Sequence, residues 1–391
     1  MSTALSEIKE FEQELIAIRR DIHRHPETAF EEHRTAQLVA DLLIEWGVEV
    51  HRGLAKTGVV GTLKGSLPGR TIGLRADLDA LDIEECSKCE HKSIHEGKMH
   101  ACGHDGHTAM LLGAVRYFSR NRDFPGTIHF IFQPAEEGLG GGRVMVEEGL
   151  FKLFPCEMVF GMHNMPGIGS GDFAICPGPM MAASDTWTVN FIGTGGHGSM
   201  PQGATDATLA AAGFITTMQS IVSRNVAPLD AAVLSVGYIQ GGHYDSANVI
   251  PSRVVVRGTA RSFLPATQDT LEKRLGQIAQ ACALAHSCTV EFDYLRRYPS
   301  VINTEQETEL AVRAAIETVG KDRVNSELRP LSGSEDFSFM LKKVPGAYIL
   351  IGNGRDGDYC ANVHTPQYDF NDSILVTGSA YWVNLVKQVN L

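Results

Sequence analysis

The sequence predicts an α/β protein in which a small domain is inserted into a larger one, and three observations support this fold class. Between residues 57 and 164, short β-branched segments alternate with helical patterns, as in a sheet flanked by helices. From residue 184 the order becomes strand, helix, strand, strand, helix, strand, which is the ferredoxin-like plan βαββαβ. After residue 304 the first pattern returns. We therefore expect one discontinuous domain, residues 1–183 and 295–391, interrupted by residues 184–294.

The larger domain is expected to begin with two helices. Residues 5–22 carry apolar side chains at spacings of three and four, the stripe of an amphipathic helix, and Pro26 lies beyond its end. A second helix over residues 31–46 closes at Gly47. The elements that follow are strands 57–65 and 71–77, helix 104–120, strand 127–133, helix 141–150 and strand 157–164. We expect functional side chains at the carboxyl ends of these strands.

The inserted domain has a distinct composition as well as a distinct order. Its expected elements are strand 184–194, helix 204–223, strands 231–240 and 252–263, helix 266–287 and strand 289–295. It holds only 8 acidic and 6 basic residues, a smaller charged share than the 20% of the whole chain. This low charge predicts surface that is buried or faces a partner. Helix 305–319, strand 347–352 and helix 371–388 complete the larger domain.

Composition excludes several classes of protein. With 391 residues, 43% of them hydrophobic, the chain reads as globular, with two or three domains. Its net charge of −12 disfavours nucleic-acid and anionic-membrane surfaces. The first twenty residues include several acidic ones, and no run of about 18 apolar residues occurs. The 8 cysteines are too sparse for a disulfide scaffold. We expect a soluble cytoplasmic protein with reduced thiols, no membrane or nucleic-acid partner, and a small-molecule substrate.

The densest chemistry lies in MHACGHDGHTAMLLGA (99–114), where Cys102 and His104 sit in a turn before an apolar helix. Thiolate and imidazole suit zinc, and also nickel, cobalt or manganese when carboxylates join them. Taken alone, the pair is also consistent with a buried thiol and a helix-capping histidine.

Two adjacent carboxylates form the second element of a possible site. Glu136 and Glu137 close strand 127–133 and enter a glycine-rich turn. On an extended chain, neighbouring side chains point to opposite sides, so one carboxylate could hold a metal while the other acts as general base. Metal-assisted hydrolysis requires both a metal-binding carboxylate and a general base. A solvated acidic turn is the simpler alternative. His163 ends the next strand, and His364 lies in a loop near the C-terminus.

Together these residues resemble the amidohydrolase branch of the M20 metallopeptidase family, which includes hippurate hydrolases, N-acyl amino acid amidohydrolases and auxin-conjugate hydrolases. The resemblance covers nearly the whole chain, in order. The motifs that carry it are HRHPE (23–27), LRADLDAL (74–81), KMHACGHDGHT (98–108), FQPAEEG (132–138), GMHN (161–164), GTGGHGSMP (193–201), NVIP (248–251), GTAR (258–261), SGSEDFS (332–338) and HTPQYDFND (364–372).

The resemblance implies a metal-dependent aminopeptidase-like α/β catalytic domain with an inserted ferredoxin-like domain that serves as lid and dimerisation module. It further implies two divalent ions, of zinc, manganese, nickel or cobalt, and Glu136 as general base. The implied ligands are Cys102, His104, Glu137, His163 and His364. Cys102 stands where peptidase branches use a bridging aspartate. Asp77 is expected to orient a ligand, with Arg75 in the place of those branches' histidine. Asp82 replaces a usual proline, which leaves acyl preference open.

For the substrate, the resemblance implies residues of the inserted domain. His197 would stabilise the oxyanion from the opposite subunit of a homodimer formed through residues 184–294. Asn248 and Arg261, which we place at the ends of adjacent strands, would bind the substrate carboxylate, and Gly333 would let the backbone approach it. A loop-capping asparagine and a solvated arginine are the simpler alternatives.

The implied activity is hydrolysis of the amide bond of N-acyl amino acids. Dipeptidase, carboxypeptidase and N-acetyl-diaminopimelate deacetylase activities stay open within the family. From a different class, GTGGHG (193–198) fits a dinucleotide-binding motif, but no helix follows directly and no acidic residue stands at the required distance. CSKCEH (86–91) resembles half of a zinc site without its partner half, so a loop is the preferred interpretation. His100 and His107 are expected outside the ligand set.

Overall fold

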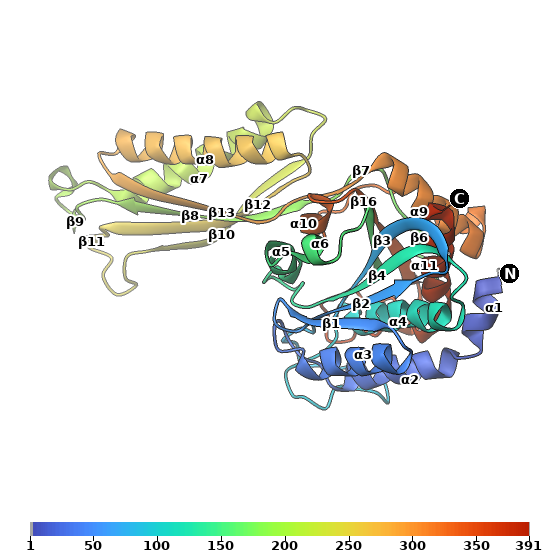
Figure 1. The fold of residues 1–391 in the computed structure, drawn as a ribbon. Coiled ribbons are helices and arrows are strands. Elements are labelled where there is room, and N and C mark those ends of the chain that lie inside the picture. The colour runs from blue at the N-terminus through green and yellow to red at the C-terminus, as the bar shows by residue number, and fades with distance from the viewer. Residues whose placement is uncertain (1–2, 391) are drawn as a thin grey trace. The chain divides into compact units, whose positions relative to one another are not determined.

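The computed structural model describes residues 3–390, which divide into two compact units. The first unit comprises the chain up to Met180, Ile302–Arg329 and the chain from Asp336 onward. The second comprises Met181–Val301 and Pro330–Glu335. The first is a mixed α/β unit and the second follows the order βαββαβ, so the predicted fold class is confirmed (Figure 1).

An eight-stranded sheet forms the centre of the first unit. Its order is β1 (Glu49–Leu54), β2 (Gly58–Lys64), β4 (Pro125–Gln133), β3 (Leu67–Asp77), β5 (Met158–Pro166), β16 (Gly346–Gly354), β6 (Phe173–Ala174) and β15 (Val324–Asn325). The four central strands β4, β3, β5 and β16 are parallel, and their side chains are largely buried. The sequence did not predict strand β1. This edge strand is mostly exposed, so it lacks the alternation of buried and exposed side chains by which strands are predicted.

Helices pack around this sheet. They are α1 (Thr3–Lys9), α2 (Glu12–Arg24), α3 (His33–Glu45), α4 (His104–Arg120), α5 (Gly141–Glu147), α6 (Leu150–Leu153), α9 (Glu305–Val319), α10 (Ser338–Leu341) and α11 (Leu375–Val389). Helices α4 and α11 pack against each other and both contact β3, whereas α3 contacts β1 and β2 (Figure 1). Among the described residues, no helix combines the length and apolar character needed to cross a bilayer.

Two predicted helices are each divided in the structure. The expected helix 5–22 breaks between α1 and α2, where the Phe11 N–H donates to the Ile8 carbonyl at 3.1 Å in a tight turn. Both apolar side chains stay buried, because this tighter turn still places residues three apart on one face. The expected helix 141–150 divides into α5 and α6 at Gly149, whose φ of +99° lies in the left-handed region.

The second unit is an antiparallel sheet with two helices on one face (Figure 1). Its strands are ordered β10 (Ala232–Gly241), β12 (Arg253–Ser262), β8 (Ala183–Ile192) and β13 (Thr289–Tyr298), with helices α7 (Ala207–Asn225) and α8 (Pro265–Ala285). Strand β8 alternates buried and half-buried side chains, and its Trp187, Val189 and Phe191 enter the core beneath the helices. Short strands β9 (Gly196–His197) and β11 (Val249–Ile250) pair separately. Strands β7 (Gly178–Met181) and β14 (Val301–Asn303) also pair.

Candidate metal centre

The candidate site lies at the carboxyl ends of parallel strands in the first unit. Asp77 is the last residue of β3 and pairs with Gln133, the last residue of β4. His163 lies near the end of β5, the other parallel neighbour of β3. Open α/β sheets place their functional groups at this edge, as the sequence predicts.

A glycine shapes the turn that carries Cys102 and His104. Gly103 has a φ of +90°, and His104 is the first residue of α4. A Cβ on Gly103 would stand 2.3 Å from Asn164 Nδ2 and 2.4 Å from the Tyr368 hydroxyl. No other residue fits there without displacing these buried groups. Glycine at position 103 thus allows the Cys102 thiol and the His104 imidazole to project into the same site.

Glu136 and Glu137 lie in a turn beyond β4, not at its end, so the argument from strand alternation was wrong. Ala135 has a φ of +55°, which turns the chain before the pair. Oxygens of both carboxylates come within 4.8 Å of each other and of a ring nitrogen of His104. Glu136 Oε1 also accepts a long hydrogen bond of 3.4 Å from the Asp336 N–H. Both carboxylates therefore face the same cluster.

The two later histidines are held by the backbone. His163 Nδ1 lies 2.5 Å from the Asn164 carbonyl, to which it donates, and its Nε2 lies 3.3 Å from Cys102 Sγ. His364 has a φ of +62° and donates its N–H to the Ala101 carbonyl at 2.7 Å. Its Nε2 lies 3.0 Å from a carboxylate oxygen of Glu137. Each imidazole thus turns one ring nitrogen toward the cluster.

The five predicted ligands form two overlapping triads. One consists of Cys102, His104 and His163, and the other of Cys102, Glu137 and His364, with the donor atoms of each within 4.8 Å of one another. Buried His104 Nε2 has no hydrogen-bond partner among the described residues. A buried ring nitrogen without a hydrogen-bond partner needs another ligand to satisfy it. Because it lies among thiol, imidazole and carboxylate donors, the site is suited to divalent transition metals.

Burial and neighbouring charges shift the pKa values of three of the predicted ligands. Burial, together with the charges of Glu137 and Glu136, raises the pKa of the Cys102 thiol well above its usual range. Burial opposes protonation of His104, but the nearby carboxylates of Asp77, Asp79 and Glu137 raise its pKa to about 10. Burial lowers the pKa of His163 well below its usual range. Bound cations would supply the positive charge that these acidic groups lack.

Asp77 does not make the contact that we expected. Its Oδ1 accepts from His107 Nδ1 at 2.6 Å, and its Oδ2 accepts from Arg75 at 2.8 Å. His107 Nε2 in turn accepts from the Asn164 N–H at 2.9 Å, so neither of its ring nitrogens is free. The distance from Asp77 to His104 Nε2 is 3.7 Å. Asp77 therefore orients His107, while the acid that contacts His104 is Asp79, which sequence reasoning missed.

Arg75 links three polar side chains beside the site. Fully buried, it donates to Asp77, to Gln133 at 2.9 Å and to Asp336 at 3.0 Å. Asp336 is the residue whose N–H reaches Glu136. This network ties the segment after residue 335 to the turn that carries the proposed base.

The CSKCEH segment forms an ion-paired cluster with α2. Cys89, His91, His23 and Asp369 bring donor atoms within 4.8 Å of one another. The Arg19 guanidinium contacts the last three of these side chains. It lies 2.7 Å from His91 Nε2 and pairs with Asp369. A fixed positive charge at this point opposes a cation, so the structure favours the loop interpretation.

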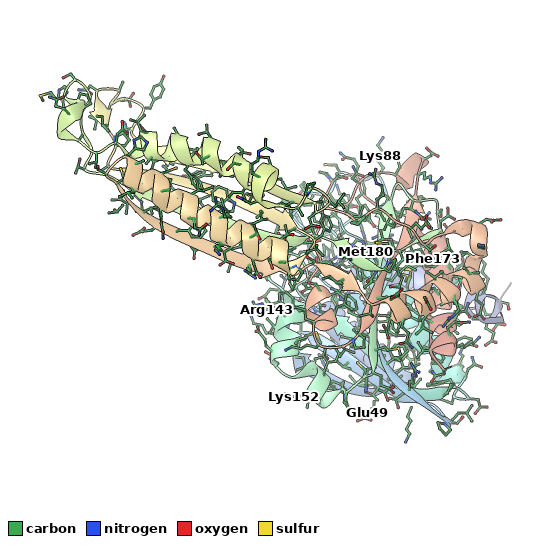
Figure 2. The ribbon with its side chains drawn as sticks, turned by 90° about the horizontal axis from the view of Figure 1, so that it is seen from above. Glu49, Lys88, Arg143, Lys152, Phe173 and Met180 are labelled. Atoms are coloured by element: carbon green, nitrogen blue, oxygen red, sulfur yellow. The ribbon has the colours of Figure 1, made fainter. Side chains whose placement is uncertain are left out.

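The same loop borders an open cavity of about 780 Å³. The exposed Lys88 side chain marks its position in Figure 2. Burial raises the pKa of the Cys89 thiol to about 11. Sequence reasoning missed the role of Arg19, because nothing in the local pattern of α2 distinguishes it from a solvated arginine.

His197 belongs to the second unit, on the short strand β9. It is exposed, and its Nδ1 accepts from the Ser199 N–H at 3.1 Å. The ring proton of the neutral form therefore lies on Nε2, which can donate to a ligand. The dinucleotide alternative gains no support, because α7 begins only at Ala207 and its N-terminus is capped by Asp206, which accepts from the Thr208 N–H at 2.8 Å.

Asn248 and Arg261 do not end adjacent strands, which corrects our expectation. Asn248 precedes β11, and its carbonyl accepts from the Gly198 N–H at 2.7 Å, beside His197. Strand β12 begins at Arg253, and Arg261 lies eight residues later, near the other end of the strand. In an extended strand this separation is about 27 Å. One chain therefore presents the two side chains at opposite ends of its second unit.

Gly333 lies in the segment that joins the second unit late in the chain. Its carbonyl accepts from the Ala182 N–H at 2.9 Å. A Cβ at this glycine would stand 3.4 Å from Met181 Cε, an ordinary contact. Steric exclusion within this unit therefore does not account for the glycine.

Comparisons with known proteins show to which family the chain is related. The family described as peptidase family M20/M25/M40 matches residues 73–388. Hippurate hydrolase of Campylobacter jejuni is 40% identical over 97% of this chain and 98% of its own. Thermostable carboxypeptidase 1 of Saccharolobus solfataricus is 36% identical over 96% and 95%. A solved structure from Bacillus subtilis, described as a dinuclear metal-binding peptidase of family M20, is 32% identical, covers 97% and 98%, and has a TM-score of 0.84.

The chain belongs to peptidase family M20. It is a hydrolase of the amidohydrolase branch, with the fold of the dinuclear metallopeptidases of that family. The fold class and the resemblance expected from the sequence are thereby confirmed.

Proposed function

We propose that the protein hydrolyses the amide bond of N-acyl amino acids and releases a carboxylic acid and a free amino acid. The observation that carries this proposal is the position of Glu136 beside two ligand triads that share Cys102. A relative that is 40% identical across nearly the whole chain, a hippurate hydrolase, supports the substrate class. Free thiols in all eight cysteines and the net charge of −12 agree with a cytoplasmic enzyme that acts on a small molecule.

In this proposal each triad would hold one divalent ion, and Cys102 is the residue that both triads share. His104 and His163 complete one set, and Glu137 and His364 complete the other. Ions bound there would act as Lewis acids on water and on the scissile carbonyl. Zinc, manganese, cobalt and nickel all suit this donor set.

Glu136 is assigned as the proton carrier of the reaction. It accepts a proton from the attacking water as the new C–O bond forms, and delivers that proton to the departing amine nitrogen as the C–N bond breaks. His197 donates from Nε2 to the oxyanion of the tetrahedral intermediate, a contact worth roughly 3 kcal/mol in comparable sites.

Residues of two subunits are proposed to complete each site. The edge strand β10 exposes Val233, Tyr238 and Ile239, so its surface is suited to pairing with a second copy in a homodimer. His197 and Asn248 lie about one strand length from Arg261 within one chain. We therefore propose that His197 and Asn248 reach the metal centre of the opposite subunit. Arg261 would line a different side of the substrate site. Asn248 and Arg261 would bind the substrate carboxylate, and the guanidinium fork suits this group. Gly333 is assigned to close approach of the substrate.

Mixing two inactive variants tests the shared site. His197→Ala and Glu136→Ala dimers should each lose at least about 100-fold in kcat. A heterodimer retains one complete site, so random mixing at equal amounts should restore about a quarter of the wild-type rate. Exchange of subunits is verified by differently tagged chains. Purified heterodimers without restored activity would show that His197 acts within its own subunit.

Matched substrates test the activity and the recognition of the carboxylate. With each of the four metals, N-benzoylglycine should be cleaved with a higher kcat/KM than N-benzoylglycinamide, which lacks the charge. Arg261→Ala should reduce kcat/KM for the acid while changing little for the amide. N-acetyl and indole-acetyl amino acids, dipeptides and N-acetyl-diaminopimelate extend the panel, because one relative is a carboxypeptidase. Failure to cleave any amide with any metal would contradict the proposal.

A further inference from the structure

We propose that Glu32 is a positioning residue: its buried side chain holds the turn that carries Glu136 and Glu137, and it does so as a hydrogen-bond acceptor and not through its charge. This inference rests on the proposed function, in which Glu136 carries the proton and Glu137 binds an ion. From the sequence, Glu32 is expected only at the start of helix 31–46. The proposal follows from the segments of the chain that its carboxylate joins.

The carboxylate of Glu32 joins three segments of the chain, and its side chain is fully buried. Oε1 accepts the Ala135 N–H at 2.9 Å and the Phe30 N–H at 3.0 Å. Oε2 accepts from the Thr57 hydroxyl at 2.6 Å. Because Ala135 immediately precedes Glu136, the first of these hydrogen bonds anchors the start of the turn that carries both acidic residues.

Left-handed backbone is concentrated at these three segments. In the described part of the chain, six residues other than glycine have a φ in the left-handed region. Four of the six lie in the segments that Glu32 joins: Phe30 (+62°), Ala55 (+49°), Lys56 (+67°) and Ala135 (+55°). Residues with a Cβ keep such a conformation only where the surrounding contacts determine it. The hydrogen bonds to Glu32 are contacts of this kind.

The turn beyond β4 has little room to move around its hydrogen bond to Glu32. A Cβ on Gly58 would stand 3.3 Å from Pro134 Cδ, so the segment with Thr57 packs against the residue before Ala135. The Ala135 carbonyl accepts the Gly141 N–H at 2.9 Å. Both polar backbone groups of Ala135 are therefore engaged, which sets the direction in which the chain leaves toward the acidic pair.

These contacts require an acceptor at Oε1 and do not require a negative charge. Burial, together with the nearby charge of Asp79, raises the pKa of Glu32 to about 7. A protonated carboxyl group keeps Oε1 as acceptor for both N–H groups, while its O–H donates to the Thr57 hydroxyl. Glutamine reproduces this arrangement with its carbonyl oxygen and its NH₂ group. Aspartate keeps the charge, but it is one methylene shorter and cannot reach all three donors.

Three variants separate the acceptor from the charge. With N-benzoylglycine and saturating Mn²⁺, Glu32→Gln should keep kcat within about 3-fold of wild type, whereas Glu32→Asp should lose about 10-fold and Glu32→Leu about 100-fold. KM should change little, because the displaced group is the base and not a substrate ligand. Aspartate at least as active as glutamine at this position would overturn the inference. This comparison stays available if Glu32→Leu does not fold.

The matched control removes a buried carboxylate elsewhere in the same unit. Glu307 is 4% exposed and accepts from the Thr304 hydroxyl at the start of α9. Glu307→Leu should lower the thermal unfolding midpoint, as Glu32→Leu does, but should leave kcat unchanged. A similar loss of kcat in this control would show that turnover follows stability alone, which would also overturn the inference.

Hydrogen exchange tests the turn itself without metal or substrate. In the metal-free protein, mass spectrometry should show amide exchange of residues 135–138 that is at least about 10-fold faster in Glu32→Asp and Glu32→Leu. Exchange should be unchanged in Glu32→Gln and Glu307→Leu, and equal rates in all variants would overturn the inference. Wild type that cleaves no amide with any of the four metals would instead contradict the proposed function and leave this measurement unaffected, so the two failures are distinguishable.

Discussion

Glu136→Ala is expected to lower kcat by about 10²- to 10⁴-fold while both divalent ions remain bound. The carboxylate belongs to neither ligand triad with Cys102, yet it lies within 4.8 Å of the Glu137 carboxylate and of His104. Removing it eliminates the group that accepts and returns the proton, whereas the five proposed donors stay in place. The loss should therefore appear in kcat and not in metal content.

Steady-state kinetics with N-benzoylglycine and metal analysis by plasma emission test this prediction together. Glu147→Gln, an exposed carboxylate on α5, is the matched control and should leave both quantities unchanged. A Glu136→Ala enzyme with a nearly normal kcat would remove the assignment as general base. Loss of metal in this variant would place Glu136 among the ligands instead.

Replacing Cys102 with alanine should weaken the binding of both ions, and turnover should fall with it. The thiol is the donor that the two triads share, so its removal leaves two protein donors in each. The effect should exceed the ~10- to 100-fold weakening that follows loss of an outer-shell partner. No other single ligand substitution should affect both ions so strongly, because His104, His163, Glu137 and His364 each belong to one triad.

Ion content after dialysis and calorimetric titration with Mn²⁺ measure this effect. Cys156→Ala, which removes a half-buried thiol of the same unit, serves as the control and should keep both ions. Unchanged stoichiometry in Cys102→Ala would exclude the thiol from the centre. Selective loss of one ion would show that Cys102 is a terminal ligand and not a bridge.

Much of the fold follows from local patterns. The predicted helices 104–120 and 305–319 coincide with α4 and α9, since each has an apolar stripe and a clear boundary. The order βαββαβ could be read because its strands are long and the central strand β8 alternates in burial. The exposed edge strand β1, the tight turn between α1 and α2 and the left-handed Gly149 lack such a pattern.

The residues of the candidate site were likewise predictable from the sequence only in part. Sequence motifs identify Cys102, His104 and the Glu136–Glu137 pair, because their side-chain chemistry and close spacing are visible along the chain. The choice between Asp77 and Asp79 was not visible, since both stand in one short motif and only through-space distances show which carboxylate contacts His104.

The sequence by itself therefore determined the class of fold, the family and the donor types of the centre. Only the tertiary structure decided which carboxylate supports which histidine, that Arg19 occupies the cluster beside Cys89, and that Arg261 lies far from Asn248 within one chain. The physical reason is that helical and strand periodicities record burial of neighbouring residues. Hydrogen bonds between residues distant in sequence depend instead on how the finished elements pack.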